Sequence, residues 1–217
     1  MKYATIPTNG RDCVDRSVAS VLPQVDHLVI VEAGPERTER TYPEGVTVLS
    51  FPGSECNISK WWNLGIDYCA KLAAEAGVKY WNTAVINDDV ILPAGWMSAV
   101  VSRMRELQCA AGCSGGRLPI PIVHHHAGPV DLLTRLQGFA YVLVGEKDLR
   151  VDEDLVWWLS DDDLGARAAL AGGMVMVPGF HVEHLYPNAQ TNHSPELGAQ
   201  TGRDMETFVK KWGWRPW

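Results

Sequence analysis

The chain has 217 residues, of which 46% are hydrophobic and 21% charged, a composition that supports one folded domain with a full hydrophobic core. Its 19 Lys and Arg residues against 26 Asp and Glu residues give a formal net charge of −7, which argues against binding to nucleic acid. The five Cys residues form no CxxC pair, and the sequence contains neither a signal-peptide pattern nor an apolar run long enough for a transmembrane segment. We therefore expect a cytoplasmic protein.

Strand-like and helix-like segments alternate along the first half of the chain. Short apolar runs predict strands at 3–6, 26–34, 45–51 and 80–86. Apolar residues at helical spacing predict helices over 13–22, 58–76 and about 94–107. This alternation is typical of βαβ units with right-handed crossovers and a mainly parallel sheet.

The second half of the chain is less regular. Residues 115–128 indicate a loop with at most one strand, and the apolar runs at 136–145 and 174–179 predict two strands. A short helix is expected to end at Gly172-Gly173, and a terminal helix is expected over 204–214. Neither an internal repeat nor a linker is evident, so we expect a single domain over 1–217.

Three polar clusters follow strands of the first half, at residues 8–12, at Glu32 and at 87–89. Ligands of parallel sheets bind outside the carboxyl ends of the strands, so the three clusters should meet at one edge. Asp88 and Asp89 follow a buried strand and need a partner, which is a backbone cap, a basic side chain or a metal ion. A plain Asx turn is the alternative interpretation. Mg²⁺ commonly uses one or two carboxylates together with substrate phosphates, and the two other clusters favour the metal.

The stretch SDDDLGAR places three carboxylates, Asp161, Asp162 and Asp163, at the start of a helix. Acids there cap backbone N–H groups and suit the helix dipole, which accounts for at least one of them. Crowded carboxylates also raise one another's proton affinity, which would help a general base. Asp163 and Arg167 are four residues apart, a spacing at which helical side chains pair.

Histidines and tryptophans gather in the same half. His184 belongs to the late stretch HVEHL, with His181 and His193 as weaker candidates for a ligand. The run 124–126 is three consecutive His, and consecutive residues of an extended segment cannot all face one ion. Trp157 and Trp158 either line a ligand site or lie in the core.

Eight segments in this order resemble the GT-A fold glycosyltransferases, in particular the family 2 inverting enzymes that include bacterial rhamnosyl and polysaccharide transferases. They are ATIPTNGR, VIVEAG, NISKWWNLGI, INDDVILPAGW, GFAYVLVGEKDL, LSDDDLGARAALAGG, VEHL and FVKKWG, the fourth of which resembles the DXD region. The resemblance implies an α/β, Rossmann-like, mixed but mainly parallel sheet flanked by helices. Residues 1–108 would bind the nucleotide sugar, and residues 109–217 would hold the acceptor and the catalytic residues.

The resemblance also implies roles for individual residues. Asp89 and His184 would bind Mn²⁺ or Mg²⁺, and Asp161 would be the general base, with Asp162 as the runner-up. The donor would contact a set of polar residues near the strand ends and on the second helix, namely Pro7, Thr8, Asn9, Arg11, Glu32, Lys60, Asn63, Asn87 and Asp88.

The function expected from these features is metal-dependent transfer of a sugar from a UDP-, GDP- or dTDP-sugar to a hydroxyl of a glycan, a protein or a small molecule. Single displacement with Asp161 as base predicts inversion, while retention stays open. A nucleotidyltransferase acting on sugar phosphates is the closest rival, although PTNGRD is a poor match to its Gly-rich basic loop. A catalytically silent sugar-binding module is the rival from another class.

Overall fold

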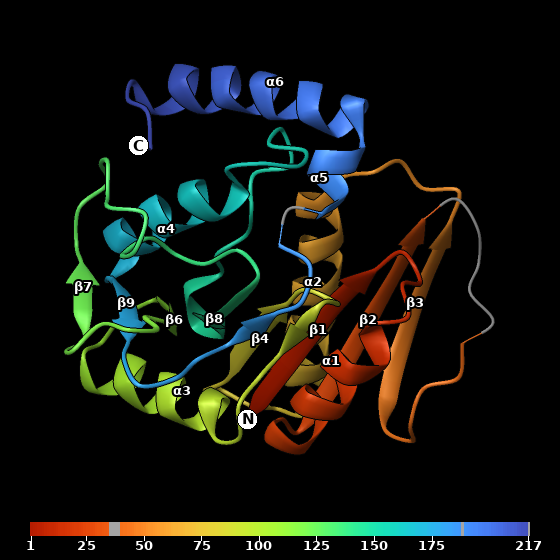
Figure 1. Cartoon of the computed structure of the whole chain (residues 1–217). Helices are drawn as coiled ribbons and strands as arrows, with labels where there is room; N and C mark the ends of the chain where they lie inside the picture. The colour runs from red at the N-terminus through yellow and green to blue at the C-terminus, as the bar shows by residue number, and fades with distance from the viewer. Residues whose placement is uncertain (35–39, 188, 217) are drawn as a thin grey trace.

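A computed structural model describes residues 1–34, 40–187 and 189–216, and the chain there forms an α/β fold around one large sheet (Figure 1). The strand order of this eight-stranded sheet is β3-β2-β1-β4-β8-β6-β9-β7. The strands are β1 (Lys2–Thr8), β2 (His27–Gly34), β3 (Val46–Pro52), β4 (Asn82–Ile86), β6 (Ala111–Ser114), β7 (Ile122–His124), β8 (Ala140–Val144) and β9 (Met174–Val177). The expected single α/β sheet domain is confirmed.

The sheet is mixed but mainly parallel. Strands β3, β2, β1 and β4 are parallel neighbours, whereas β8 runs antiparallel between β4 and β6. Strand β9 is parallel to β6, and β7 closes the edge antiparallel to β9. A separate two-stranded sheet pairs β5 (Val90–Ile91) with β10 (Glu183–His184), and it places His184 opposite Val90. The acidic end of β4 and the late histidine are thereby brought together.

Helices cover both faces of the large sheet. Helices α1 (Val14–Val21) and α3 (Trp96–Glu106) pack on one face, where alternate strand residues such as Ala4 and Ile6 point. Helices α2 (Ile58–Glu75) and α4 (Ser160–Ala171) cover the other face. Alternation of side chains along a strand gives each face its own set of apolar residues, so both layers have a core.

Helix α2 lies very close to β1. A methyl group at Gly65 would come within 1.9 Å of Thr5 Oγ1, so only glycine permits this approach. The close packing fixes the start of α2, near residues 58–62, beside the end of the central strands.

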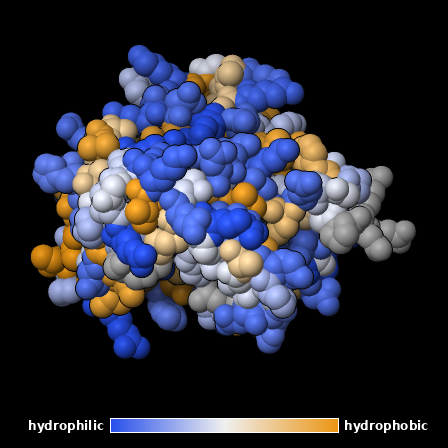
Figure 2. Space-filling view, turned by 90° about the horizontal axis from the view of Figure 1, so that it is seen from above, coloured by the Kyte–Doolittle hydropathy of each residue, from blue (hydrophilic) through white to orange (hydrophobic). Residues whose placement is uncertain are grey.

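The C-terminal helix α6 (Pro195–Trp212) lies above α4 and the upper end of α2 in Figure 1, and the short α5 (Ala189–His193) precedes it. Its inner side packs Phe208 against Leu155 and Leu159. In the view from above, hydrophilic residues cover most of this face of the molecule, with smaller apolar areas between them (Figure 2). Helix α6 therefore acts as an amphipathic cover over the loop that precedes α4.

Strand β6 and helix α6 differ from the sequence expectation, and the short elements β5 and α5 were not predicted. Strand β6 was not predicted, because its stretch AGCS has small residues and lacks the β-branched pattern, although all four residues are buried between β8 and β9. Helix α6 begins at Pro195 instead of near 204, since Ser194 accepts a hydrogen bond from the Leu197 N–H and starts the helix earlier. No helix in the described ranges combines the length and apolar character needed to cross a membrane.

Candidate active site

A pocket of about 320 Å³ opens at the carboxyl ends of β1 and β4. Its lining combines residues from both halves of the chain. The polar residues that face it are Thr8, Asn9, Arg11, Asn87, Asp88, Asp89, Arg135, Ser160, Asp161, Asp162, His184 and Thr191. The convergence of the 8–12 and 87–89 clusters, expected from the parallel strands, is therefore present, and the α4 acids and His184 join them.

Arg11 is the partner of the two acids that follow β4. Its Nε lies 3.2 Å from Asp88 Oδ2, and its Nη2 contacts Asp88 Oδ1, so the pair is bidentate. Its Nη1 also lies 3.2 Å from Asp89 Oδ2. A basic side chain, one of the three partners considered for these carboxylates, is therefore present.

Asp88 and Asp89 differ in how many of their carboxylate oxygens are bound by protein donors. Asp88 Oδ2 accepts a second hydrogen bond, 2.8 Å long, from the Thr8 hydroxyl. Burial raises the pKa of Asp88, although the hydrogen bonds from Arg11 and Thr8 oppose that rise. Asp88 is thus committed to protein contacts, which favours a supporting role.

Asp89 keeps one oxygen toward His184. The distance between Asp89 Oδ1 and His184 Nε2 is 3.2 Å. Burial by itself would raise the pKa of Asp89, but the contacts with His184 and Arg11 outweigh it and lower that pKa. The Leu185 N–H also donates to the Asp89 carbonyl at 2.8 Å, which holds the β10 strand in place.

The three consecutive acids of α4 lie in three different environments. Asp161 faces the pocket, and its Oδ2 accepts a hydrogen bond from the Gly138 N–H at 3.0 Å. Asp162 is buried and pairs with Arg135 at 3.3 Å. Asp163 is fully buried and faces away, toward α6.

Asp162 has a strongly perturbed acidity. Burial, with the neighbouring charge of Asp161, raises the pKa of Asp162 to about 8 against the opposing effect of Arg135. Its Oδ1 is buried without a hydrogen-bond partner. Asp162 is therefore largely protonated at neutral pH and would not itself accept a proton there.

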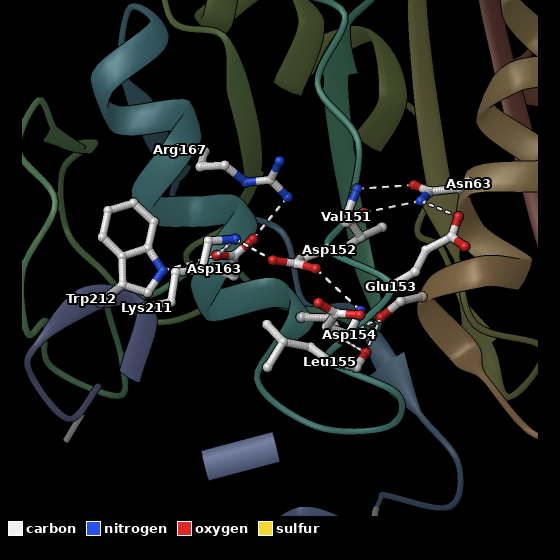
Figure 3. A network of polar contacts seen from close by, with 12 residues as sticks. Asn63, Val151, Asp152, Glu153, Asp154, Leu155, Asp163, Arg167, Lys211 and Trp212 are labelled. Carbon is white, nitrogen blue, oxygen red and sulfur yellow. Dashed lines mark hydrogen bonds and ion pairs between the residues drawn. The ribbon is translucent and has the colours of Figure 1, made fainter. Parts of the chain in front are cut away.

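Asp163 belongs to a structural network between α4 and α6 (Figure 3). Its carboxylate lies 2.7 Å from Lys211 Nζ and 2.8 Å from Arg167 Nη2, and it accepts a hydrogen bond from the Trp212 indole. Lys211 also pairs with Asp152. The expected pairing of Asp163 with Arg167 is confirmed, and the network docks α6 on α4.

Aromatic residues form much of the remaining wall. Trp157 and Trp158 line the pocket, and the Trp157 indole donates to Thr191 Oγ1 at 2.8 Å. The backbone N–H groups of both tryptophans donate to the Asp204 carboxylate of α6, at 2.8 and 2.7 Å. Both tryptophans thus line the pocket, and Trp158 also packs against the cluster of Leu155, Leu159 and Phe208.

Trp61 and Trp62 of α2 line the pocket too. Both are nearly buried, so each contributes one edge to the cavity and the rest to the core.

Three residues expected at the donor site are absent from the described lining of this pocket. Asn63 is used elsewhere: its amide donates to the Val151 carbonyl and to Glu153, and its Oδ1 accepts from the Val151 N–H (Figure 3). Lys60 is exposed on α2. Glu32 is buried beside Tyr42, whose hydroxyl donates to it at 3.2 Å. The Asn63 side chain thus holds the loop at Val151 and Glu153 and does not line the pocket.

The sequence interpretation missed Arg135, Gly138 and Asp204. Arg135 and Gly138 precede β8. Gly138 opens the segment GFAYVLVGEKDL, but neither residue was expected at the site, because both reach the α4 acids only through the chain fold. Asp204 falls inside an amphipathic helix, where an acid is ordinarily exposed. The helical spacing could have indicated this residue. Asp204 lies four residues before Phe208, so both are on the apolar, buried face of the helix.

Searches against family models and against curated proteins find no match to the sequence. Among solved structures, a crystal structure of S. aureus TarS 1-349 aligns with a TM-score of 0.55 and 13% identity, over 99% of this chain and 72% of that one. Another S. aureus TarS structure aligns with a TM-score of 0.56 and 11% identity, over 97% of this chain and 42% of that one. TarS is a GT-A glycosyltransferase. This chain has the GT-A fold.

The GT-A resemblance implies a divalent cation at the end of β4, and two side chains there could serve as its ligands. Asp89 Oδ1 is a buried oxygen without a hydrogen-bond partner, and His184 Nε2 lies 3.2 Å from it. No group of three or more His, Cys, Asp or Glu suited to a metal occurs among the described residues. Two protein ligands fit a Mn²⁺ or Mg²⁺ ion whose remaining ligands are diphosphate and water oxygens.

Proposed function

We propose that this chain is a metal-dependent glycosyltransferase that transfers a sugar from a nucleoside diphosphate sugar to an acceptor hydroxyl with inversion. The observation that carries the proposal is the shared pocket. Arg11, Asp89 and His184 face the same cavity as Asp161. A leaving-group site and a proton acceptor are the two requirements of a single displacement at a sugar carbon.

The donor would lie over the ends of β1 and β4. Pro7, Thr8 and Asn9 line this side of the pocket, and Arg11 provides a positive charge for phosphate. Asn87 also lines this side, where the donor ribose is expected. Mn²⁺ or Mg²⁺ held by Asp89 and His184 would supply charge neutralisation for the departing diphosphate.

The acceptor would lie on the α4 side. The Gly138 N–H orients Asp161 through Oδ2, which leaves Oδ1 to take the proton of the attacking hydroxyl. The protonated Asp162 next to it adds no second negative charge at neutral pH. Trp157 and Trp158 offer apolar faces beside this acid.

The two rival functions have less support. A nucleotidyltransferase has no use for an oriented carboxylate at the acceptor side of the pocket. A silent sugar-binding module would keep the aromatic wall but would not need Asp161, Asp89 and His184 around one cavity. The UDP-, GDP- or dTDP-sugar donor, the glycan, protein or small-molecule acceptor, and the cytoplasmic location stay predictions.

The experiment is a donor panel. The protein is incubated with UDP-, GDP- and dTDP-sugars, with Mn²⁺, with Mg²⁺ or with a chelator, and release of the nucleoside diphosphate is measured. We expect release with one donor class and its loss with the chelator. Absence of release, together with absence of a thermal shift with every donor, would contradict the proposal.

A variant assigns the base. Asp161→Asn should abolish transfer while the donor still binds, because the amide cannot accept the hydroxyl proton. Asp67→Asn is the matched control, since Asp67 is an exposed acid of α2 that pairs with Arg150. Loss of donor binding in Asp161→Asn would show that Asp161 has another role.

A further inference from the structure

Arg11 occupies the space between the two carboxylates that would otherwise attract a cation. Its guanidinium contacts both oxygens of Asp88 and Oδ2 of Asp89. The Arg11 side chain is 24% exposed, while those of Asp88 and Asp89 are 5% and 4% exposed. The ion pairs are thus shielded from solvent on the carboxylate side, where screening by water is weak.

Asp88 and Asp89 make different contacts in this arrangement. Asp88 is saturated by Arg11 and by the Thr8 hydroxyl, so it serves to hold the guanidinium in place. Asp89 shares only one oxygen with Arg11 and presents the other to His184. The side chains that fit a divalent ion therefore lie directly beside a fixed positive charge.

We propose that Arg11 makes cation binding at Asp89 and His184 conditional on a bound nucleoside diphosphate, an inference that rests on the proposed function. Two carboxylates and one guanidinium leave one net negative charge, so a divalent ion alone would make this pocket wall positive. A diphosphate adds negative charge that both Arg11 and the ion can contact. Donor and cation consequently bind with positive coupling, and Arg11 is the positioning residue that creates it.

The test measures Mn²⁺ binding directly, without turnover. Free Mn²⁺ is titrated by its electron paramagnetic resonance signal, first with the protein alone and then with saturating UDP, GDP or dTDP. For the unmodified protein we expect weak binding of Mn²⁺ alone and binding about tenfold tighter or more with the matching nucleotide.

Neutral variants remove the fixed charge. Arg11→Gln and Arg11→Met should each bind Mn²⁺ alone about tenfold more tightly than the unmodified protein, and should lose most of the nucleotide coupling. Arg11→Lys keeps the charge and should retain weak binding of Mn²⁺ alone. Arg103→Gln is the control for loss of a charge, because Arg103 is on α3 and pairs with Glu106.

Two results would overturn the inference. The first is Mn²⁺ binding by both neutral variants that is no tighter than that of the unmodified protein. The second is a neutral Arg11 variant that still binds Mn²⁺ more tightly after Asp89→Asn is added to it, because the ion would then bind at another site. If no nucleotide binds to any of these proteins, the glycosyltransferase proposal fails, whereas the effect of Arg11 on Mn²⁺ alone is decided by the first titration.

Discussion

The backbone N–H of Gly138 donates a hydrogen bond to Asp161 Oδ2 at 3.0 Å. A methyl group on Gly138 would lie 2.8 Å from that oxygen. The glycine before β8 thus both orients the proposed base and leaves room for it.

Gly138→Ala should displace the Asp161 carboxylate and lower kcat by about 100-fold, because a shift of about 1 Å at a reacting group has this effect. Donor affinity should stay unchanged, since the donor side of the pocket is untouched. Steady-state kinetics and donor titration check this. Gly202→Ala is the control, as open space surrounds Gly202 on α6, and an equal loss of kcat in both variants would contradict the prediction.

The raised pKa of Asp162 predicts how the stability of the folded chain depends on pH. Its pKa is about 8 in the folded chain against an ordinary value of 3.8, so the folded state binds the extra proton between these values. The stability provided by this proton is complete below about pH 4 and is lost as pH rises through 8. Asp161 and Arg135 face the group on one side, and His124 and His126 line the small cavity on the other.

Asp162→Asn removes this titration. The free energy of unfolding of the variant should rise relative to the unmodified protein as pH increases from 4 to 8, by at most about 1.4 kcal/mol per pH unit. Urea unfolding at several pH values measures the difference. A difference that is constant over this range would show that the Asp162 carboxyl is not protonated in the folded chain.

Asp163 is predicted to matter for stability and not for chemistry. Asp163→Asn weakens its contacts with Lys211 and Arg167, and should lower the free energy of unfolding by about 1.5–3 kcal/mol. Asp148→Asn, which weakens an exposed pair with Arg150, should change it by less than about 0.5 kcal/mol. Urea unfolding compares the two. Equal effects would mean that the contact between α4 and α6 does not depend on this network.

Asp204 is predicted to hold the tryptophan wall. Its carboxylate accepts hydrogen bonds from the backbone N–H groups of residues 156–158, and an amide in Asp204→Asn has only one accepting oxygen. The variant should lose about 1.5–3 kcal/mol of stability and part of the near-ultraviolet circular dichroism of its tryptophans. Glu206→Gln, at an exposed position of α6, is the control and should leave both unchanged. An unaltered tryptophan signal in Asp204→Asn would contradict the prediction.

Much of the fold follows from local patterns along the chain. Mainly apolar runs identified β2 and β4, because strands covered by helices on both faces are rich in apolar residues. Their alternation with helical periodicity predicted a mainly parallel sheet, and hence one edge for the polar clusters. The small-residue strand β6 escaped prediction, since its identity as a strand comes from its neighbours β8 and β9.

The sequence by itself determined that polar clusters of the first half would share one edge of the sheet, because ligands and polar residues gather at the carboxyl ends of parallel strands. The clusters at 8–12 and 87–89 do meet in the pocket, whereas Glu32 does not line it. Only the tertiary structure decided which partner each acid has. Arg11 pairs with Asp88 and Asp89, while Asn63 turns to a distant loop. The tertiary structure also gives the three consecutive acids of α4 different partners. Successive helical residues point about 100° apart, so each acid meets a different neighbour. Partner choice depends on contacts between segments far apart in the chain, and local propensity carries no information about those contacts.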